Sequence, residues 1–270
     1  MPDASRPSVR VGVVWALTAG VLAAGVVGAW RPWRRPAPAA EVAGGAGLAN
    51  TGADASAPAA LMVPTGATVL VFGDSWTYGS AASDPALGYA YQLGRITGWT
   101  TVVDGVRGSG YLKPGLDGPS FGERIAALDP ALTPDLIVIQ GSINDRLLVS
   151  GSDYAGAVNA AWDALSATYP DASIVVLGPA PQVLPLETGT VLIDAELSRL
   201  AAERGWWYIS PVEDAWIVDS NYFDVIDTGV GGNHPSTAGH AYLADRLAQA
   251  LAERMAVVEA AAGPPAPTEG

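Results

Sequence analysis

Residues 68–79 read TVLVFGDSWTYG, an apolar run that ends in a turn of small and polar residues. The run itself, Thr68–Phe72, predicts a β-strand, and its unbroken apolar character is typical of a strand covered on both faces. Similar runs recur at Thr100–Val103, Asp135–Ile139, Ser173–Leu177 and Trp207–Ile209. Because the intervals are long enough for crossover helices, we expect the five strands to form one parallel sheet.

Helical patterns fill the intervals between these strands. They lie near Leu87–Ile96, Tyr154–Tyr169, Val191–Arg204 and Thr237–Val258. The alternation of buried strands and helices predicts an α/β fold, namely a three-layer α/β/α sandwich around a five-stranded parallel sheet of the flavodoxin-like type.

Composition limits the classes of function. The chain has 270 residues, 49% of them apolar, a net charge of −13 and no cysteine. The negative charge argues against nucleic acid as a partner, and the lack of cysteine excludes thiol catalysis and cysteine-bound metals. Neither a phosphate-binding Gly-Lys-Ser/Thr loop nor a His-Glu-x-x-His zinc helix occurs, so we expect no cofactor and no metal.

The N-terminal part predicts a membrane segment. Val11–Trp30 carries no charge over twenty residues, enough to cross a bilayer as a helix. Arginines follow it before any small-residue cleavage site, which favours an uncleaved single-pass anchor over a secreted protein. Arginines on both sides of the run leave its orientation open by the positive-inside rule, and the extracellular placement of the domain is expected from the linker that follows. The expected organisation is a short segment (1–10), an anchor (11–30), a flexible Ala/Pro/Gly-rich linker (31–66), the folded domain (67–258) and a disordered tail (259–270).

The carboxyl ends of parallel strands form the usual ligand-binding edge of such a sheet. Ser75 follows the first strand, Gly108 the second and Asn144 the third. A serine hydroxyl needs a neighbouring base to act as a nucleophile. Of the two histidines, His234 lies in a loop before the last helix and is the better candidate, whereas His240 lies inside that helix at a packing position.

These blocks, in this order, resemble the SGNH (GDSL-like) hydrolase superfamily of serine esterases and acetylhydrolases. The resemblance spans about residues 68–258 and rests on Gly73-Asp74-Ser75 with Gly79, on Gly108, on Gly141-Ser142-Ile143-Asn144-Asp145 and on His234-Pro235. It implies that Ser75 forms an acyl-enzyme with His234 as base. It also implies an oxyanion hole made of the N–H groups of Ser75 and Gly108 and the amide of Asn144, and a substrate that is a small acyl ester or an acylated carbohydrate.

The family's orienting aspartate is missing from its usual place. It stands three residues before the histidine, where this chain has Gly231. Three alternatives remain: Asp227 orients the ring, Asp224 does so from further back, or a backbone carbonyl near Gly231 leaves a Ser-His dyad or an impaired enzyme. The first is favoured.

Other functions stay open alongside hydrolysis. The same acyl-enzyme could pass its acyl group to a sugar hydroxyl, and the missing aspartate is also compatible with a cell-surface binding module. A second serine motif, Gly118-Pro119-Ser120-Phe121-Gly122, matches the G-x-S-x-G elbow, but no β-rich run precedes it, as that elbow requires.

Overall fold

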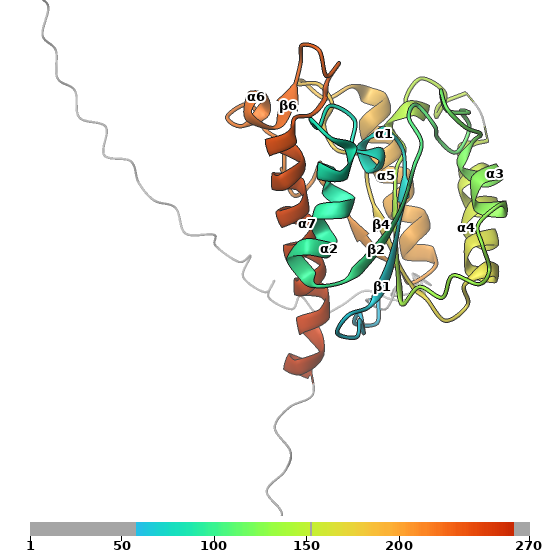
Figure 1. Cartoon of the computed structure of the whole chain (residues 1–270). Coiled ribbons are helices and arrows are strands. Elements are labelled where there is room, and N and C mark those ends of the chain that lie inside the picture. Colours follow the sequence, from blue (N-terminus) through green and yellow to red (C-terminus); the bar gives the residue numbers. More distant parts are fainter. Residues whose placement is uncertain (1–57, 152, 262–270) are drawn as a thin grey trace, which may run out of the picture. The chain divides into compact units, whose positions relative to one another are not determined.

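The computed structural model describes residues 58–261 except residue 152, with side chains described as far as residue 255. Its centre is a sheet of five parallel strands in the order β2-β1-β3-β4-β5, which is the flavodoxin-like order (Figure 1). The strands are β1 (Thr68–Gly73), β2 (Thr100–Gly105), β3 (Leu136–Gln140), β4 (Ser173–Leu177) and β5 (Trp207–Ile209). All five predicted strands are confirmed, with ends that differ by at most two residues.

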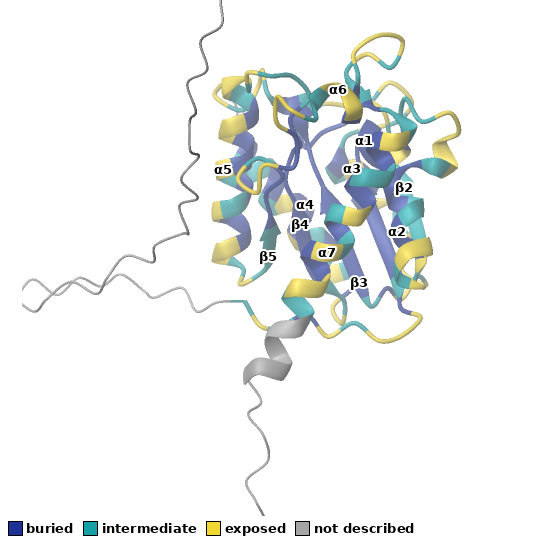
Figure 2. Ribbon diagram, turned by 90° about the vertical axis from the view of Figure 1, so that its left-hand side faces the viewer, coloured by how far each residue is buried: buried dark blue, intermediate teal, exposed yellow. Residues whose placement is uncertain are grey.

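Helices cover both faces of the sheet. The longer ones are α2 (Tyr89–Thr97), α4 (Tyr154–Thr168), α5 (Thr188–Glu203) and α7 (Thr237–Ala261). Helices α2 and α7 pack on one face, whereas α4, α5 and the short α3 (Phe121–Ala126) pack on the other. The three-layer α/β/α sandwich is therefore confirmed, and Figure 2 shows that the central strands are buried while the helices have exposed outer sides.

Alternation along β1 explains the two layers. Val69 and Val71 belong to the core shared with α2 and α7, and Leu70 and Phe72 belong to the core on the other side. All four side chains have no exposed surface. Successive side chains of a strand point to opposite faces, so a strand buried on both faces must be apolar throughout.

Short elements occupy the carboxyl edge of the sheet, where the sequence predicted only loops. They are α1 (Ser75–Tyr78), the 3₁₀ turns η1 (Pro85–Leu87) and η2 (Ile143–Asp145), α6 (Tyr222–Val225), and a two-stranded antiparallel pair, β6 (Ile226–Asp227) with β7 (His234–Pro235). Each is too short to show a hydrophobic period, which is why sequence patterns do not reveal it.

The first described residues pack on the domain. Leu61 is 5% exposed and belongs to the core beside α7, and the Ala59 carbonyl accepts a hydrogen bond from Trp207 Nε1 at 2.7 Å. The end of the predicted linker thus contacts the domain before residue 67. The predicted anchor at 11–30 lies outside the described residues, as do 1–10, most of the linker and most of the tail. Within the described part, no helix has the length and apolar character to span a bilayer.

Candidate active site

Ser75 is placed by the turn that ends β1. The side chain of Asp74 caps α1, its Oδ1 accepting the Trp76 N–H at 2.9 Å. This contact turns the chain sharply out of the strand, so that Ser75 begins a short helix at the carboxyl edge of the sheet. Ser75 is 5% exposed, and its side chain lines a cavity of about 700 Å³.

His234 reaches Ser75 from the β6–β7 pair, 159 residues further along the chain. Its Nε2 lies 2.9 Å from the Ser75 hydroxyl oxygen, and its Nδ1 lies 2.8 Å from the Gly231 carbonyl oxygen. A carbonyl oxygen can only accept a hydrogen bond, so Nδ1 carries the proton in the neutral ring. Nε2 is then left with a lone pair directed at the serine hydroxyl, the tautomer that a general base needs.

The position of Asp227 differs from the favoured expectation. Asp227 is the β-ladder partner of His234, yet its carboxylate accepts the Gly229 N–H at 2.8 Å, and the contact at His234 Nδ1 is the Gly231 carbonyl. Asp224 lies exposed on α6. The Gly231 backbone lies close against Asp227, since a β-carbon at position 231 would lie only 2.7 Å from the β-carbon of Asp227. The structure therefore brings Ser75 and His234 together with a backbone acceptor.

Candidate oxyanion donors line the same cavity as Ser75 and His234. Gly108 has φ of +74°, a conformation suited to glycine, and Asn144 stands in η2 after β3. Within the described residues, the backbone N–H groups of Ser75 and Gly108 have no protein acceptor. Asn144 Nδ2 donates to the Ser109 carbonyl at 2.9 Å, which uses one of its two hydrogens. Three donors are thus available in the cavity that Ser75 and His234 line.

The buried carboxylate of Asp145 ties two of these loops together. It accepts the backbone N–H groups of Tyr111, Leu112 and Lys113 at 2.7, 3.3 and 3.2 Å, and the Ser142 hydroxyl at 3.1 Å. Burial raises its pKa, whereas these hydrogen bonds lower it. Asp145 therefore holds the loop after Gly108 against the segment that carries Asn144. Sequence reasoning gave it no role beyond its place in the motif.

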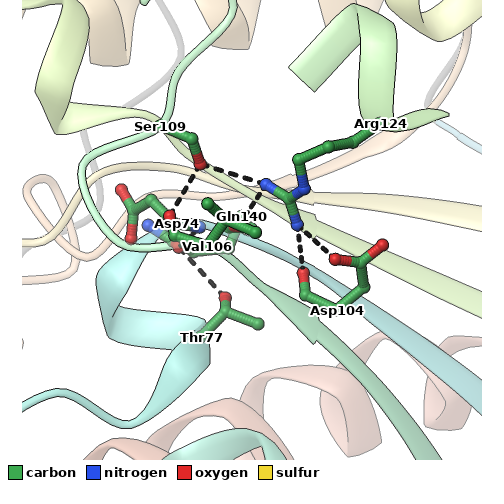
Figure 3. Close-up of polar contacts among 8 residues, drawn as sticks. Asp74, Thr77, Asp104, Val106, Ser109, Arg124 and Gln140 are labelled. Carbon is green, nitrogen blue, oxygen red and sulfur yellow. Dashed lines mark hydrogen bonds and ion pairs between the residues drawn. The ribbon is translucent and has the colours of Figure 1, made fainter. Parts of the chain in front are cut away.

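A buried arginine, Arg124, holds the carboxyl ends of β1 and β2 together next to the Ser75 turn (Figure 3). Arg124 of α3 donates to the Gly73 carbonyl at 2.9 Å, to the Ser109 hydroxyl at 3.0 Å, and to the carbonyl and carboxylate of Asp104 at 2.7 and 2.5 Å. Its guanidinium also lies 4.2 Å from the centre of the Phe72 ring. Arg124 thus links the ends of β1 and β2 to the oxyanion loop. Nothing in the sequence pattern singles it out.

Two further buried groups support the turn around Ser75. Burial raises the pKa of Asp74 to about 6, and its Oδ2 is buried with no partner among the described residues. His240 is fully buried; its Nδ1 accepts the Tyr89 N–H at 3.2 Å, and its Nε2 lies 3.0 Å from the Ser80 carbonyl. Burial lowers the pKa of His240 to about 4, so the ring is neutral at pH 7 and has the packing role expected for it.

The rival serine motif lies in a different context. Ser120 is the N-cap of α3, where it forms a capping box with Glu123. No strand directly precedes it, so it is no nucleophile elbow. Among the side chains that the structure describes, no group of three His, Asp or Glu residues is able to hold a metal ion.

Comparisons with known proteins agree with the fold and the family. A GDSL lipase of Mycobacterium tuberculosis is 30% identical over 194 residues, which cover 67% of this chain and 79% of that protein. A family two carbohydrate esterase from Clostridium thermocellum, solved with cellohexaose, matches with a TM-score of 0.55 at 19% identity, over 71% of this chain and 65% of that one. A two-domain esterase active on acetylated mannans matches with a TM-score of 0.53 at 20% identity, over 70% of this chain and 49% of that one.

At such identities the two solved structures show the shared fold alone. The family itself is shown by the sequence, since residues 71–242 match the GDSL-like lipase/acylhydrolase family and these residues contain Ser75, Gly108, Asn144 and His234. The chain therefore belongs to the GDSL-like lipase/acylhydrolase family and is a carboxylic ester hydrolase.

Proposed function

We propose that the enzyme hydrolyses esters through an acyl-enzyme on Ser75. The 2.9 Å contact between Ser75 Oγ and His234 Nε2 carries this proposal. His234 takes the serine proton as Oγ attacks the ester carbonyl, and then gives that proton to the departing alcohol oxygen. In the second half, His234 takes a proton from water, the resulting hydroxide attacks the acyl carbonyl, and the proton returns to Ser75 as the acid leaves.

Negative charge develops on the carbonyl oxygen in both tetrahedral intermediates. The N–H groups of Ser75 and Gly108 and the second amide hydrogen of Asn144 are the donors that stabilise it. Their availability within the described residues supports this role. Donors fixed before the reaction stabilise a developing charge without further reorganisation.

The proposed orienting group for His234 is the Gly231 carbonyl rather than a carboxylate. A carbonyl selects the same tautomer as an aspartate would, because it accepts the Nδ1 hydrogen. It stabilises the imidazolium less, because it carries only a partial charge. The enzyme therefore works as a Ser-His dyad, and Asp227 shapes the turn that presents the carbonyl.

The proposed substrate is a small acyl ester on a carbohydrate. Two observations support it: the solved carbohydrate esterases share this fold, and the cavity beside Ser75, at about 700 Å³, is far larger than a short acyl group requires. A sugar or a comparable alcohol would occupy the remaining space. Hydrolysis is proposed rather than acyl transfer because the family is one of hydrolases.

Hydrolysis of 4-nitrophenyl acetate and butyrate by the full chain tests this function. Ser75→Ala and His234→Ala are each expected to lower kcat/KM by about 10⁴-fold or more, as when the nucleophile or base of a serine hydrolase is removed. Ser166→Ala, on α4 and away from the cavity, is the matched control and should keep full activity. Full activity in Ser75→Ala would overturn the proposal.

We also propose that residues 11–30 tether the enzyme to a membrane, with the domain outside the cell. The uncharged twenty-residue run supports the tether, and the Ala/Pro/Gly-rich linker at 31–66 supports a domain projected away from the membrane on the outer side. Cell fractionation of the full chain and of a form lacking residues 11–30 provides the test. The full chain is expected with the membranes and the shortened form in the soluble fraction, and equal partitioning of the two would contradict the tether.

A further inference from the structure

The active-site cavity is unusually rich in positive charge for this acidic protein. Five of the chain's 14 Lys and Arg residues precede residue 58, and three of the remaining nine line the cavity. They are Arg107, Arg146 and Lys113, the last being the chain's only lysine. The chain as a whole carries a net charge of −13. A third of the domain's cations thus face a single cavity, where they counter the repulsion that an acidic protein exerts on an anion.

The three cations are attached to the oxyanion loops. Arg107 immediately precedes Gly108, and Arg146 follows Asn144 by two residues. The backbone of Lys113 is held at both ends, because its N–H donates to Asp145 at 3.2 Å and its carbonyl accepts the Gly110 N–H at 2.8 Å. The three residues therefore line the cavity from the same loops that carry Gly108 and Asn144, and the backbone of Lys113 is fixed there.

Lys113 is free to meet a ligand. Its side chain is exposed and has no ion-pair partner among the described residues. Arg107 pairs with Asp117 through Nε and one terminal nitrogen, and Arg146 Nε lies 2.6 Å from Glu187. The Arg107 pair is about half exposed, and exposed pairs of this kind contribute little to stability, so a ligand can compete for the guanidinium. The other terminal nitrogen of Arg107 has no hydrogen-bond partner in the part of the chain that the structure describes.

We propose that Lys113, assisted by Arg107 and Arg146, selects esters whose alcohol part carries a negative charge, such as an acylated sugar bearing a carboxylate. This inference rests on the proposed function, because it names the substrate class of the same site. The alcohol part is the charged one because the acyl carbonyl lies between Ser75 and the oxyanion donors, which leaves the rest of the cavity and its cations to the alcohol. Arg107 and Arg146 add to the field, and Lys113 supplies the direct partner.

A pair of matched esters tests the proposal: 4-acetoxybenzoate, which is an anion, and its neutral methyl ester. The measured quantity is the ratio of their kcat/KM values, compared among wild type, Lys113→Met and Lys113→Arg of the full chain. The ratio is expected to fall about tenfold in Lys113→Met and to recover in Lys113→Arg. In wild type it should also fall as salt rises from 0.02 to about 0.5 M, because salt screens exposed charges.

Arg199→Met is the control for the change in net charge. Arg199 lies on α5 outside the cavity, paired with Glu196 and Glu203, so this variant should leave the ratio unchanged. An equal ratio in wild type and Lys113→Met, with both esters hydrolysed, would overturn the anion preference and leave the proposed function intact. Failure of wild type to hydrolyse either ester would instead overturn the proposed function, and this inference with it.

Discussion

The two sides of the catalytic cavity are built differently. On the oxyanion side, Asp145 holds the loops through hydrogen bonds to three backbone N–H groups, and Arg124 through hydrogen bonds to two backbone carbonyls. On the histidine side, His234 sits in a two-residue strand beside a turn that contains glycines 229, 231 and 232, and its ring is held by the Gly231 carbonyl. The residues of that turn are mostly exposed.

This contrast matches the demands of the chemistry. Oxyanion donors work only if they are fixed before the charge appears, which calls for buried supports with several hydrogen bonds. The histidine must exchange protons with serine, alcohol and water during one turnover. A single carbonyl fixes its tautomer without adding a full charge beside the ring. Changes on the two sides should therefore differ in size and kind.

Among substitutions that compare the two sides of the cavity, removal of an oxyanion donor should lower activity most. Asn144→Ala is expected to lower kcat about 10²–10³-fold with little change in KM, because the amide acts mainly on the transition state. Steady-state kinetics on 4-nitrophenyl acetate measure it. Asn159→Ala on α4, outside the cavity, is the control. If kcat fell less than about threefold in Asn144→Ala, the amide would not be part of the oxyanion hole.

The buried acid beneath the serine should make stability depend on pH. The folded pKa of Asp74 is about 6 against an ordinary 3.8, so between these values the folded state holds a proton that the unfolded state has lost. Its contribution to stability is therefore greatest at low pH and falls as pH rises from about 4 to 6. At about 1.4 kcal/mol per pKa unit, the fall is about 3 kcal/mol.

Urea unfolding of wild type and Asp74→Asn between pH 4 and 7 measures this fall. Asparagine keeps the cap on the Trp76 N–H but does not titrate, so the difference in unfolding free energy between the two proteins should shift in favour of the variant as pH rises. A difference that stays constant across this range would show that Asp74 does not bind a proton on folding.

A single methyl group on the histidine side should disturb activity more than stability. In Gly231→Ala the new β-carbon would lie 2.7 Å from the β-carbons of Ala81 and Asp227, so the turn and its carbonyl must shift. We expect kcat/KM to fall about 10–100-fold, in line with the cost of small displacements of catalytic groups. Gly122→Ala, where the added carbon meets nothing within 4 Å, is the matched control and should stay active. Equal activity in both variants would contradict the role of the Gly231 carbonyl.

The smallest effect is expected at Asp227. Asp227→Asn keeps an acceptor for the Gly229 N–H, and kcat/KM should stay within about threefold of wild type. A carboxylate that oriented the ring would behave differently, since its loss costs about 10⁴-fold in the serine protease template. Values of kcat/KM for 4-nitrophenyl butyrate distinguish a carbonyl from a carboxylate as the group that orients His234. A loss of about 10⁴-fold in Asp227→Asn would show that Asp227 orients the ring, as the sequence predicted.

The sequence predicted the parts of this protein that repeat a pattern. Each strand was visible as an apolar run, and Ser75, Gly108 and Asn144 were found because the ends of parallel strands meet at one edge. The histidine side was less accessible to such reasoning. The β6–β7 pair has strands of only two residues, and the conformation of its turn depends on the backbone dihedral angles of several glycines. Sequence spacing therefore pointed to Asp227 as the partner of His234 Nδ1, whereas in the structure that partner is the Gly231 carbonyl.

Buried polar supports were also invisible in the sequence. Arg124 reads as an ordinary surface residue of a short helix, yet its side chain is 6% exposed and bonds three separate segments. Such contacts are set by tertiary packing, which no local pattern records. The same is true of Arg146, which is distant in the chain from Arg107 and Lys113 and lines the same cavity only because the loops meet.

Covalent labelling of the full chain by a serine-directed fluorophosphonate tests the central claim, that Ser75 is a nucleophile activated by His234, most directly. Peptide mass spectrometry should find one phosphonyl group per chain, on Ser75, with no label in Ser75→Ala and much slower labelling in His234→Ala. Label on another serine, or none on a folded and active wild type, would contradict the account.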